Sequence, residues 1–426
     1  MTVARVSPGP LSGRIRPPGS KSYTHRALVM GFFAGRPFEI RDPLVSDDTR
    51  ATRVGLDRLG AHTTRSGARW RIAPSEGAGR ALGRTRVVDC GESGTTLRFL
   101  SAVAATRTFP VRLVGRPGLA RRPIGALATS LRAAGARVEP APGRSLPLLL
   151  RGPIHAGRFA VDASESSQYA SALLLALPSL DGRSSLRLTG TTVSAAYIDA
   201  TLAILRAHGI RVRGGPRAWT VEGPARPVGR SFTVPGDASS AAYLWAGAAV
   251  TGGEVTVDHV PSAWPQADRR ILGILASAGA TVRDSASGAT VRGPLSGGFD
   301  VDLMSAPDLY PLVGALAATR PERSILRGAR HVVLKESDRR TATIELVRAL
   351  GGRARSTRAG LEIRGTRGRR APTLPPSTDH RVVMSGAIAA LAGDGPVRVG
   401  DAGCVAKSFP GFWSALASLG TEVTVR

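Results

Sequence analysis

The stretch "PGDASSAAYLWAGAAV", residues 235–250, decides the fold. A Pro-Gly turn and a polar start lead into small and apolar residues that cover every side of a helix. A helix that is apolar all round is buried rather than half exposed. The stretch "PPGSKSYTHRALVMG", residues 17–31, has the same layout. We therefore expect helices in the interior of the protein and sheets covering them.

Both stretches belong to a repeat. Polar turns precede apolar runs at intervals of 70 to 73 residues, at Ser20, Gly91, Ala163, Gly236, Ala306 and Thr378. Out of phase with them, helical patterns end in a glycine before a strand-like stretch, at Gly60, Gly135, Gly209, Gly279, Gly351 and Gly420. The polar residues suit N-caps and the glycines suit left-handed C-caps. Stretches such as "RVEPAPGRSLPLLLRG", residues 137–152, indicate hairpins. The sequence predicts six βαβαββ units.

The six units divide into two lobes. The units that open at Ser20 and Gly236 each follow a Pro-Gly pair, an extended crossing typical of a hinge. We place one lobe at 20–236 and the other at 1–19 plus 237–426, with hinges near 18–20 and 235–237. The last strands of the second lobe then need the N-terminal segment to complete them. A solenoid is the alternative, but units of about 71 residues with their own helices and hairpin argue against it.

Composition limits the possible partners. The net charge is +27, yet aromatic residues are only 5%, which is poor for stacking on bases. The arginines are scattered except in "RGTRGRRAP", residues 364–372. We expect small anionic substrates and no nucleic acid. Two cysteines form no disulfide framework, the N-terminus shows no signal peptide, and the longest apolar run is too short to span a membrane. We expect a cytoplasmic protein.

The lysines are unusually placed. Only Lys21, Lys335 and Lys407 are lysines among the 58 basic residues, and all three lie in helix-opening turns or a charged cluster. Where arginine serves elsewhere, these positions predict a need for a compact, titratable ammonium. The turns themselves predict anion sites, because backbone N–H groups and hydroxyls gather at helix N-termini. Two faces with three such turns each could enclose an anionic substrate.

Each of these residues also has a purely structural interpretation. Ser166, Ser167 and Asp308 suit ordinary helix caps. The run 335–339, "KESDR", suits a solvated charged face. Taken singly, these turns are weak signals.

Together the motifs resemble a known family. The stretches "PGSKS", "GESGTTLRF", "RRPIGAL", "SSQ", "SAAYID", "PGDASSAAY", "PDLYP", "KESDR", "DHR" and "AKSFPGF" occur in this order along nearly the whole chain. The chain resembles the 5-enolpyruvylshikimate-3-phosphate synthase family. The resemblance implies a two-lobed, inside-out, barrel-like α/β fold with three βαβαββ units per lobe, similar to what the repeat predicts. It also implies transfer of enolpyruvyl from phosphoenolpyruvate to the 5-hydroxyl of shikimate 3-phosphate through a tetrahedral intermediate. We expect no metal or organic cofactor and a monomer.

The resemblance also implies roles for single residues. Asp308 is the expected base and Glu336 the expected acid, with Lys21 between the substrates. The residues expected at shikimate 3-phosphate are Lys21, Ser22, Arg26, Ser166, Ser167, Gln168, Ser194, Tyr197, Asp308 and Lys335. Those expected at phosphoenolpyruvate are Lys21, Gly94, Arg122, Gln168, Arg339, Arg381 and Lys407.

Three positions depart from the family pattern. Glu92, Ala195 and His331 stand where the family commonly has Asn, Lys and Asn. They leave open a paralogue that acts on a related cyclohexene acid. A sister enzyme acting on a UDP-amino sugar is a poorer match, because "GRPGLARRPIG", residues 115–125, lacks the loop cysteine of that enzyme. An RNA-end-binding protein with similar repeat units is the alternative from a different class. Turnover of phosphoenolpyruvate, or salt-sensitive RNA binding, distinguishes them.

Overall fold

The structure is a computed structural model that describes residues 2–75, 84–358, 360–367 and 373–426. It divides into two compact units, Gly19–Val234 and Met1–Pro18 with Pro235–Arg426. The chain passes between the units only at residues 18–19 and 234–235. Residues 368–372 of the arginine-rich stretch lie outside the described residues.

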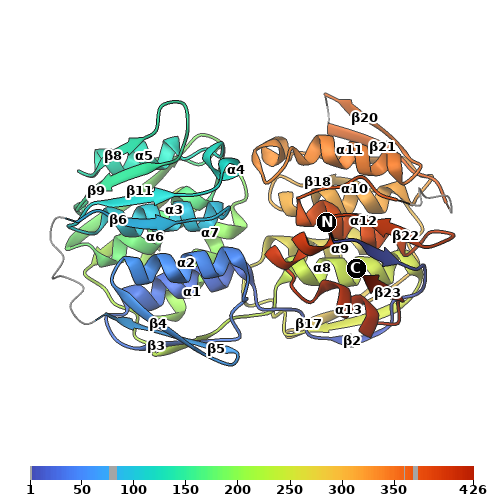
Figure 1. Cartoon of the computed structure of the whole chain (residues 1–426), viewed down its shortest axis with the longest axis horizontal. Coiled ribbons are helices and arrows are strands. Elements are labelled where there is room, and N and C mark those ends of the chain that lie inside the picture. Colours follow the sequence, from blue (N-terminus) through green and yellow to red (C-terminus); the bar gives the residue numbers. More distant parts are fainter. Residues whose placement is uncertain (1, 76–83, 359, 368–372) are drawn as a thin grey trace. The chain divides into compact units, whose positions relative to one another are not determined.

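The described part of the unit Gly19–Val234 carries three four-stranded sheets, ordered β14-β3-β5-β4, β6-β7-β9-β8 and β10-β11-β13-β12 (Figure 1). The first pair in each sheet is parallel and the other two pairs are antiparallel. The strands are β3 (Phe38–Arg41), β4 (Ala61–Ser66), β5 (Arg69–Pro74), β6 (Arg86–Asp89), β7 (Val111–Val114), β8 (Arg137–Pro140), β9 (Leu148–Arg151), β10 (Arg158–Asp162), β11 (Gly182–Thr189), β12 (Val212–Gly214), β13 (Ala218–Gly223) and β14 (Ser231–Thr233). The helices are α1 (Lys21–Phe33), α2 (Asp47–Arg58), α3 (Gly94–Ala105), α4 (Pro117–Ala120), α5 (Gly125–Ala133), α6 (Gln168–Ala176), η1 (Leu177–Ser179) and α7 (Ala196–Ala207).

The described part of the other unit carries two four-stranded sheets, β16-β17-β15-β2 and β18-β19-β21-β20, and the three-stranded sheet β22-β1-β23. Its strands are β1 (Ala4–Val6), β2 (Gly13–Ile15), β15 (Glu254–Asp258), β16 (Thr281–Asp284), β17 (Gly288–Arg292), β18 (Asp300–Asp302), β19 (Ser324–Arg327), β20 (Arg353–Thr357), β21 (Gly360–Arg364), β22 (Val397–Val399) and β23 (Val423–Val425). Its helices are α8 (Ala238–Thr251), η2 (Ala267–Arg270), α9 (Ile271–Ser277), η3 (Pro307–Leu309), α10 (Tyr310–Ala318), η4 (Arg330–Leu334), α11 (Arg339–Ala349), α12 (His380–Ala390), η5 (Ala402–Lys407) and α13 (Phe412–Ser418).

The first helix of each repeat lies inside, as predicted. In one unit α1, α3 and α6 contact one another, and in the other α8, α10 and α12 do. These helices are buried over most of their length, and α10 over all of it. Their uniform apolarity removes any face that water could stabilise. None of the helices in the described ranges is long and apolar enough to cross a membrane.

The six predicted glycine stops are confirmed. All six glycines that end the second helices have φ between 72° and 113°. Side chains with a β-carbon rarely adopt this left-handed backbone, so glycine is favoured here by local geometry alone.

The predicted N-caps are confirmed at Ser93, Asp237 and Asp379, whose side chains accept a backbone N–H of the first turn. The prediction is wrong at Ser20 and Ser167, which make no capping bond. Ser167 is itself helical, with φ −66° and ψ −15°, so its side chain cannot fold back over the first turn. Before α10, the short helix η3 takes the place of a cap.

The N-terminal segment completes the second unit, as predicted. β1 lies between β22 and β23 and is antiparallel to both, and β2 extends the sheet of β15. The prediction of a hairpin in the sixth repeat is wrong. One strand, β23, follows α13, and β1 supplies its partner from the other end of the chain.

Candidate active site

A dense group of charges surrounds Asp308 in the unit Met1–Pro18 with Pro235–Arg426. The carboxylate Oδ1 lies 2.7 Å from Arg339 Nη1 and 3.4 Å from Lys335 Nζ. The other oxygen, Oδ2, lies 2.9 Å from Arg381 Nη2. Asp308 comes from η3, Arg339 opens α11 and Arg381 lies in the first turn of α12. Residues from the starts of three helical segments therefore converge on one carboxylate, and two of these starts are opening turns of the repeat.

Arg339 is the hub of this group. Its guanidinium also donates to Glu336 Oε2 at 2.8 Å and to Asp379 Oδ2 at 2.9 Å, and its side chain is 1% exposed. Asp379 in turn caps α12 and accepts from Ser337 Oγ at 2.9 Å. Such a fork, fully used by three carboxylates, fixes Arg339 far better than one surface ion pair does.

The charges set the protonation state of Asp308. Burial alone would raise its pKa, but Arg381, Lys335 and Arg339 hold it well below the ordinary value of an aspartate. Burial likewise opposes the charge on Asp379, and Arg339 lowers the pKa of that carboxyl. Asp308 is therefore a carboxylate at neutral pH and, in this state, a weak base.

Asp268 shares Arg381 with Asp308. Its Oδ2 lies 3.8 Å from Arg381 Nη1 and accepts a hydrogen bond from Ser239. Its other oxygen is buried with no hydrogen-bond partner. Burial raises the pKa of Asp268 to about 6, against the opposing charge of Arg381. Arg381 thus lies between two carboxyl groups: Asp308, which is firmly ionised, and Asp268, whose ionised form burial disfavours.

In the unit Gly19–Val234, Lys21 lies at the start of α1. Its Nζ is 3.2 Å from Asp48 Oδ2, with 17% of the side chain exposed. Ser20 precedes it, and the Ser20 hydroxyl is buried with no hydrogen-bond partner. The helix start therefore combines a half-buried cation with uncapped backbone N–H groups, a combination that attracts anions.

Arg26 follows Lys21 by one and a half turns and is 2% exposed. It donates to Ser22 O at 2.8 Å, Thr201 Oγ1 at 2.9 Å, Tyr197 O at 2.7 Å and Ser171 Oγ at 3.3 Å. Burial lowers its pKa to about 10. All its partners here are neutral. Arg26 therefore joins α1, α6 and α7 through neutral partners. Its positive charge lies among the residues expected to bind shikimate, without a carboxylate among these partners to offset it.

The turn that opens α3 carries the next predicted residues. A β-carbon at Gly94 would lie 2.8 Å from Arg122 Nη1, so the guanidinium lies directly against this glycine. Gln168 donates to Thr95 Oγ1 at 3.1 Å and accepts from Arg98 Nη1 at 2.7 Å. The predicted pair Gly94 and Arg122 and the predicted Gln168 thus lie around one turn.

The serines lie in loops beside these residues. Ser166 Oγ accepts from the backbone N–H of Gln168 at 3.2 Å, and Ser167 is buried at the start of α6. Ser194 is buried with a left-handed φ of 54°, and the nearby Tyr197 supplies its carbonyl to Arg26.

Four further residues complete the placement. Lys407 ends η5 and is close enough to Cys404 to oppose the rise that burial causes in the pKa of that thiol. Of the departures from the family pattern, Glu92 and Ala195 are exposed. His331 is buried, and burial followed by Lys335 lowers its pKa to about 4. His331 is therefore neutral beside the Asp308 group.

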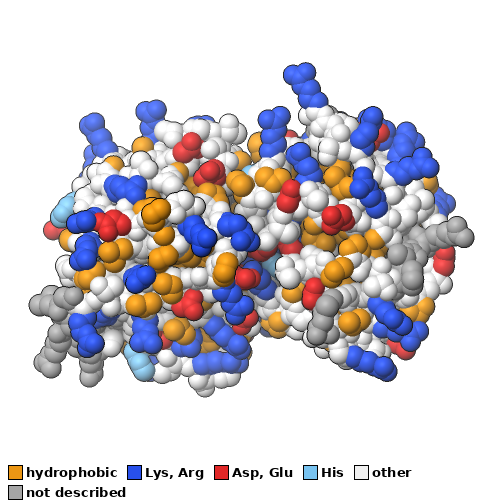
Figure 2. Space-filling view, turned by 45° about the horizontal axis from the view of Figure 1, so that its top comes forward, with side chains coloured by type: hydrophobic (Ala, Val, Ile, Leu, Met, Phe, Trp, Pro, Cys, Tyr) orange, Lys and Arg blue, Asp and Glu red, His pale blue; other side chains and the backbone are white. Residues whose placement is uncertain are grey.

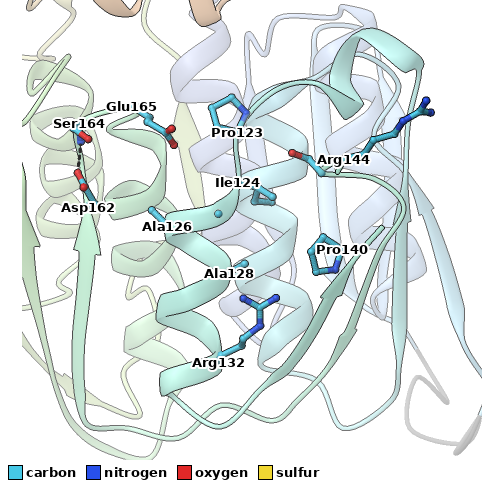
Figure 3. A pocket seen from close by; sticks show the side chains of 12 residues that line it. Pro123, Ile124, Ala126, Ala128, Arg132, Pro140, Arg144, Asp162, Ser164 and Glu165 are labelled. Carbon is cyan, nitrogen blue, oxygen red and sulfur yellow. Dashed lines mark hydrogen bonds between the residues drawn. The ribbon is translucent and has the colours of Figure 1, made fainter. Parts of the chain in front are cut away.

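A pocket of about 520 Å³ adjoins the loop after Arg122 (Figure 3). Arg132 and Arg144 line it, with Asp162, Ser164 and Glu165 across from Arg144. Its Pro123 carbonyl accepts from Arg98 Nη2 at 2.9 Å. The pocket is thus joined to Gln168 by two hydrogen bonds through Arg98, but none of the predicted residues lines it.

The predicted residues fall into two sets. Lys21, Ser22, Arg26, Gly94, Arg122, Ser166, Ser167, Gln168, Ser194 and Tyr197 lie in the unit Gly19–Val234, and Asp308, Lys335, Glu336, Arg339, Arg381 and Lys407 in the other. Ion pairs join Asp308, Lys335, Glu336, Arg339 and Arg381 into one group. The roles themselves stay predictions.

Sequence reasoning missed four partners of these residues: Asp48, Arg98, Asp268 and Asp379. Asp379, directly before "HR" at a helix start, was expected only as an N-cap and not as a partner of Arg339. Asp48 lies in "SDDT", residues 46–49, within the capping box of α2. Nothing in "PQADRR", residues 265–270, marks Asp268.

Basic side chains do not gather in one patch on the face of the molecule that Figure 2 draws. Figure 2 shows Lys and Arg side chains spread among Asp, Glu and apolar side chains. The expectation that the protein binds no nucleic acid stays a prediction.

Comparison with known proteins gives a consistent result. Residues 6–416 match the family model "EPSP synthase (3-phosphoshikimate 1-carboxyvinyltransferase)". Relatives named 3-phosphoshikimate 1-carboxyvinyltransferase include that of Methanoculleus marisnigri, 38% identical over 97% of this chain and 98% of the relative. That of Methanosphaerula palustris is 36% identical over 97% and 98%. The solved EPSP synthase of Acinetobacter baumannii has a TM-score of 0.81, 24% identity and full coverage of both chains, which shows a shared fold.

Proposed function

The chain belongs to the EPSP synthase family, and from that premise we propose how its residues carry out the family reaction, the transfer of enolpyruvyl from phosphoenolpyruvate to shikimate 3-phosphate. The observation that carries the proposal is the Asp308 carboxylate, held by Lys335, Arg339 and Arg381 within 3.4 Å. A base, an acid and three cations in one group suit the addition of a hydroxyl to an anionic enol phosphate.

Asp308 removes the proton of the 5-hydroxyl, whose oxygen then bonds to C2 of phosphoenolpyruvate. Glu336 gives a proton to the C3 methylene, which becomes a methyl group in a tetrahedral intermediate. In the second half, Asp308 passes the hydroxyl proton to the leaving phosphate and, as a carboxylate again, takes a methyl proton while the C–O bond to phosphate breaks. That proton returns to Glu336 before the next turnover. The double bond re-forms and phosphate leaves with its electron pair. Arg339 touches both carboxyls and positions acid and base together.

The substrate itself activates the base. Without substrate, the carboxylates of Asp308, Glu336 and Asp379 neutralise Arg339. Phosphoenolpyruvate brings a phosphate and a carboxylate that compete for Arg339 and Arg381. As these cations turn to the substrate, Asp308 loses the contacts that depress its pKa and becomes a stronger base. The proton is accepted only when the second substrate is present.

The other unit binds shikimate 3-phosphate in this proposal. Ser166, Ser167 and Ser194 take its phosphate, Ser22 and Arg26 its carboxylate end, and Gln168 and Tyr197 its ring. Lys335 contributes to the same substrate and Lys21 to both. Arg122 with Gly94, together with Lys407, adds to the grip on phosphoenolpyruvate. We therefore propose that 20–236 and 1–19 plus 237–426 act as lobes, with hinges near 18–20 and 235–237, and that turnover needs residues of both.

The test is phosphate release from phosphoenolpyruvate in the presence of shikimate 3-phosphate, with shikimate alone and 3-phosphate-free cyclohexene acids as parallel substrates. We expect turnover with shikimate 3-phosphate and none with shikimate. Turnover with shikimate or another cyclohexene acid, and none with the phosphate ester, would contradict the proposal and favour a paralogue. The neutral His331 beside Lys335 is the observation that favours that second candidate.

We further propose that the protein works as a cytoplasmic monomer, without cofactor. Both thiols are free, and Cys90 is buried. Size-exclusion chromatography with light scattering tests the oligomeric state: a mass near 44.3 kDa is expected.

A further inference from the structure

A buried chain of hydrogen bonds joins α1, α2 and α3 behind the predicted anion-binding turns. His25 Nδ1 lies 2.7 Å from Thr52 Oγ1, and Thr52 Oγ1 lies 2.7 Å from Thr96 Oγ1. Thr96 Oγ1 in turn lies 3.1 Å from the backbone carbonyl of Asp48. All three side chains are at most 1% exposed. None of them belongs to the residues that the proposed reaction uses.

The direction of every bond follows from the last acceptor. A carbonyl only accepts, so the Thr96 hydroxyl donates its one hydrogen to Asp48 O. The Thr96 oxygen must then accept a hydrogen bond from the Thr52 hydroxyl, which donates its one hydrogen there. Thr52 must therefore accept from His25, and the hydrogen between them belongs to Nδ1. The chain fixes the tautomer of His25.

The rest of the surroundings agree with this tautomer. His25 Nε2 is buried with no hydrogen-bond partner. A bare nitrogen lone pair costs less there than an unpaired N–H group would. Burial lowers the pKa of His25 to about 3, with Lys21 and Arg26 opposing protonation and Asp48 favouring it. Phe99 of α3 packs edge-on to the ring at 6.4 Å between centroids. The imidazole is therefore neutral at neutral pH.

We propose that His25, as its Nδ1–H tautomer, is a positioning residue that sets the spacing of two substrate-binding turns. The proposal deepens the function proposed above and rests on it for its kinetic part. The chain ends at Asp48, whose carboxylate holds Lys21 at 3.2 Å. It passes through Thr96, whose N–H also donates to the Ser93 cap at 3.1 Å, one residue before Gly94. The Lys21 turn and the Gly94 turn are thus tied to one another through three side chains.

The test compares variants that break the chain with variants that keep it. His25→Leu and Thr52→Val remove a donor with little change in volume. His25→Asn places an amide N–H near the Nδ1 position, and Thr52→Ser keeps the hydroxyl. Loss of one buried hydrogen bond predicts a fall of about tenfold in kcat/KM for the first pair, and rescue to within about twofold of wild type for the second.

A matched control separates positioning from stability. His208 is another buried histidine of the same unit, but its ring contacts the carbonyls of Ile204 and Ser231 and the rings of Phe38 and Phe232. His208→Asn should lower the melting temperature and leave kcat/KM within about twofold of wild type. If His25→Leu does not fold, the Thr52 pair decides. Equal kcat/KM in Thr52→Val and Thr52→Ser would overturn the proposal.

The tautomer is tested without any substrate. In protein with ¹⁵N-labelled histidine, long-range ¹H–¹⁵N spectra show which ring nitrogen carries the proton. The histidine signal that is lost in His25→Asn should be a neutral Nδ1–H tautomer in the wild type at pH 5. If that signal is instead an Nε2–H tautomer or an imidazolium at pH 5, the tautomer and the proposal with it are overturned. Failure of the wild type to turn over phosphoenolpyruvate would instead overturn the proposed function and leave this result standing.

Discussion

Two groups of charges, one in each unit, are held in opposite ways. Around Asp308, three cations face four carboxyls in the described residues, those of Asp268, Asp308, Glu336 and Asp379. Around Arg26 and Gln168, the cations Arg26 and Arg98 donate to hydroxyl, amide and backbone oxygens instead. The first group can exchange partners and move protons when an anion arrives. The second keeps a fixed positive charge. The difference predicts that substitutions in the first change kcat and those in the second change KM.

The largest effect should come from the carboxylate at the centre of the first group. Asp308→Asn keeps the shape but removes the base, so kcat should fall by about 10³-fold, with KM for shikimate 3-phosphate changed little. Steady-state phosphate release measures both constants. Asp300→Asn, which breaks the exposed pair with Arg327, is the control and should leave kcat intact. A kcat within tenfold of wild type in Asp308→Asn would remove Asp308 from the chemistry.

Lys21 tests whether the shape of a cation matters. Lys21→Arg keeps the charge but replaces a compact ammonium with a wide fork beside Asp48, and we expect a loss of about 10²-fold in kcat/KM. Arg112→Lys, at an exposed position of β7, is the matched exchange in the opposite direction and should have no effect. Wild-type activity in Lys21→Arg would refute the argument from the three lysines.

Arg26 tests the second group directly. A lysine ammonium in Arg26→Lys cannot replace the planar guanidinium that makes four hydrogen bonds. The KM for shikimate 3-phosphate should therefore rise by about tenfold while kcat changes less. Arg107→Lys is the control, since Arg107 is half-buried in the same unit and its guanidinium contacts Thr106 and the ring of Phe32. A change in kcat larger than the change in KM would contradict the assignment of the Arg26 group to substrate binding.

The smallest effect concerns Asp268 and pH. Because its folded pKa is raised to about 6, its protonated form stabilises the fold at low pH, and that contribution is lost as pH rises through about 6. Asp268→Asn mimics the protonated form. Relative to wild type, its melting temperature should therefore improve between pH 4.5 and pH 7.5. The exposed Asp181→Asn should show no such trend, and the opposite trend in Asp268→Asn would contradict the assignment.

The fold was predictable wherever a local rule decided it. Gly60 and its five counterparts end helices in a left-handed conformation, and that conformation depends only on a few neighbouring backbone dihedrals. The burial of α8 could likewise be predicted from its own residues, because they are apolar on every side of the helix. The place of β1 between β22 and β23 was expected only in outline, because pairing across more than 390 residues depends on the whole unit.

The site was half predictable for the same reason. Residues in helix-opening turns, such as Asp308 and Arg381, could be predicted as site candidates from their position in the repeat. Their partners did not, because the meeting of Asp268 with Arg381 depends on how η2 packs beside α12. The low pKa of Asp308 is a sum over three elements, and no stretch of sequence contains it.

The central claim is that substrate anions release Asp308 from its cations. It is tested most directly by ¹³C NMR of protein labelled at the aspartate carboxyls, with the Asp308 signal assigned by its loss in Asp308→Asn. In the free protein this carboxyl should titrate well below the ordinary pKa of an aspartate. Shikimate 3-phosphate with inorganic phosphate, which occupies the cations without turnover, should raise that pKa. An unchanged pKa with both present, or an ordinary value in the free protein, would contradict the account.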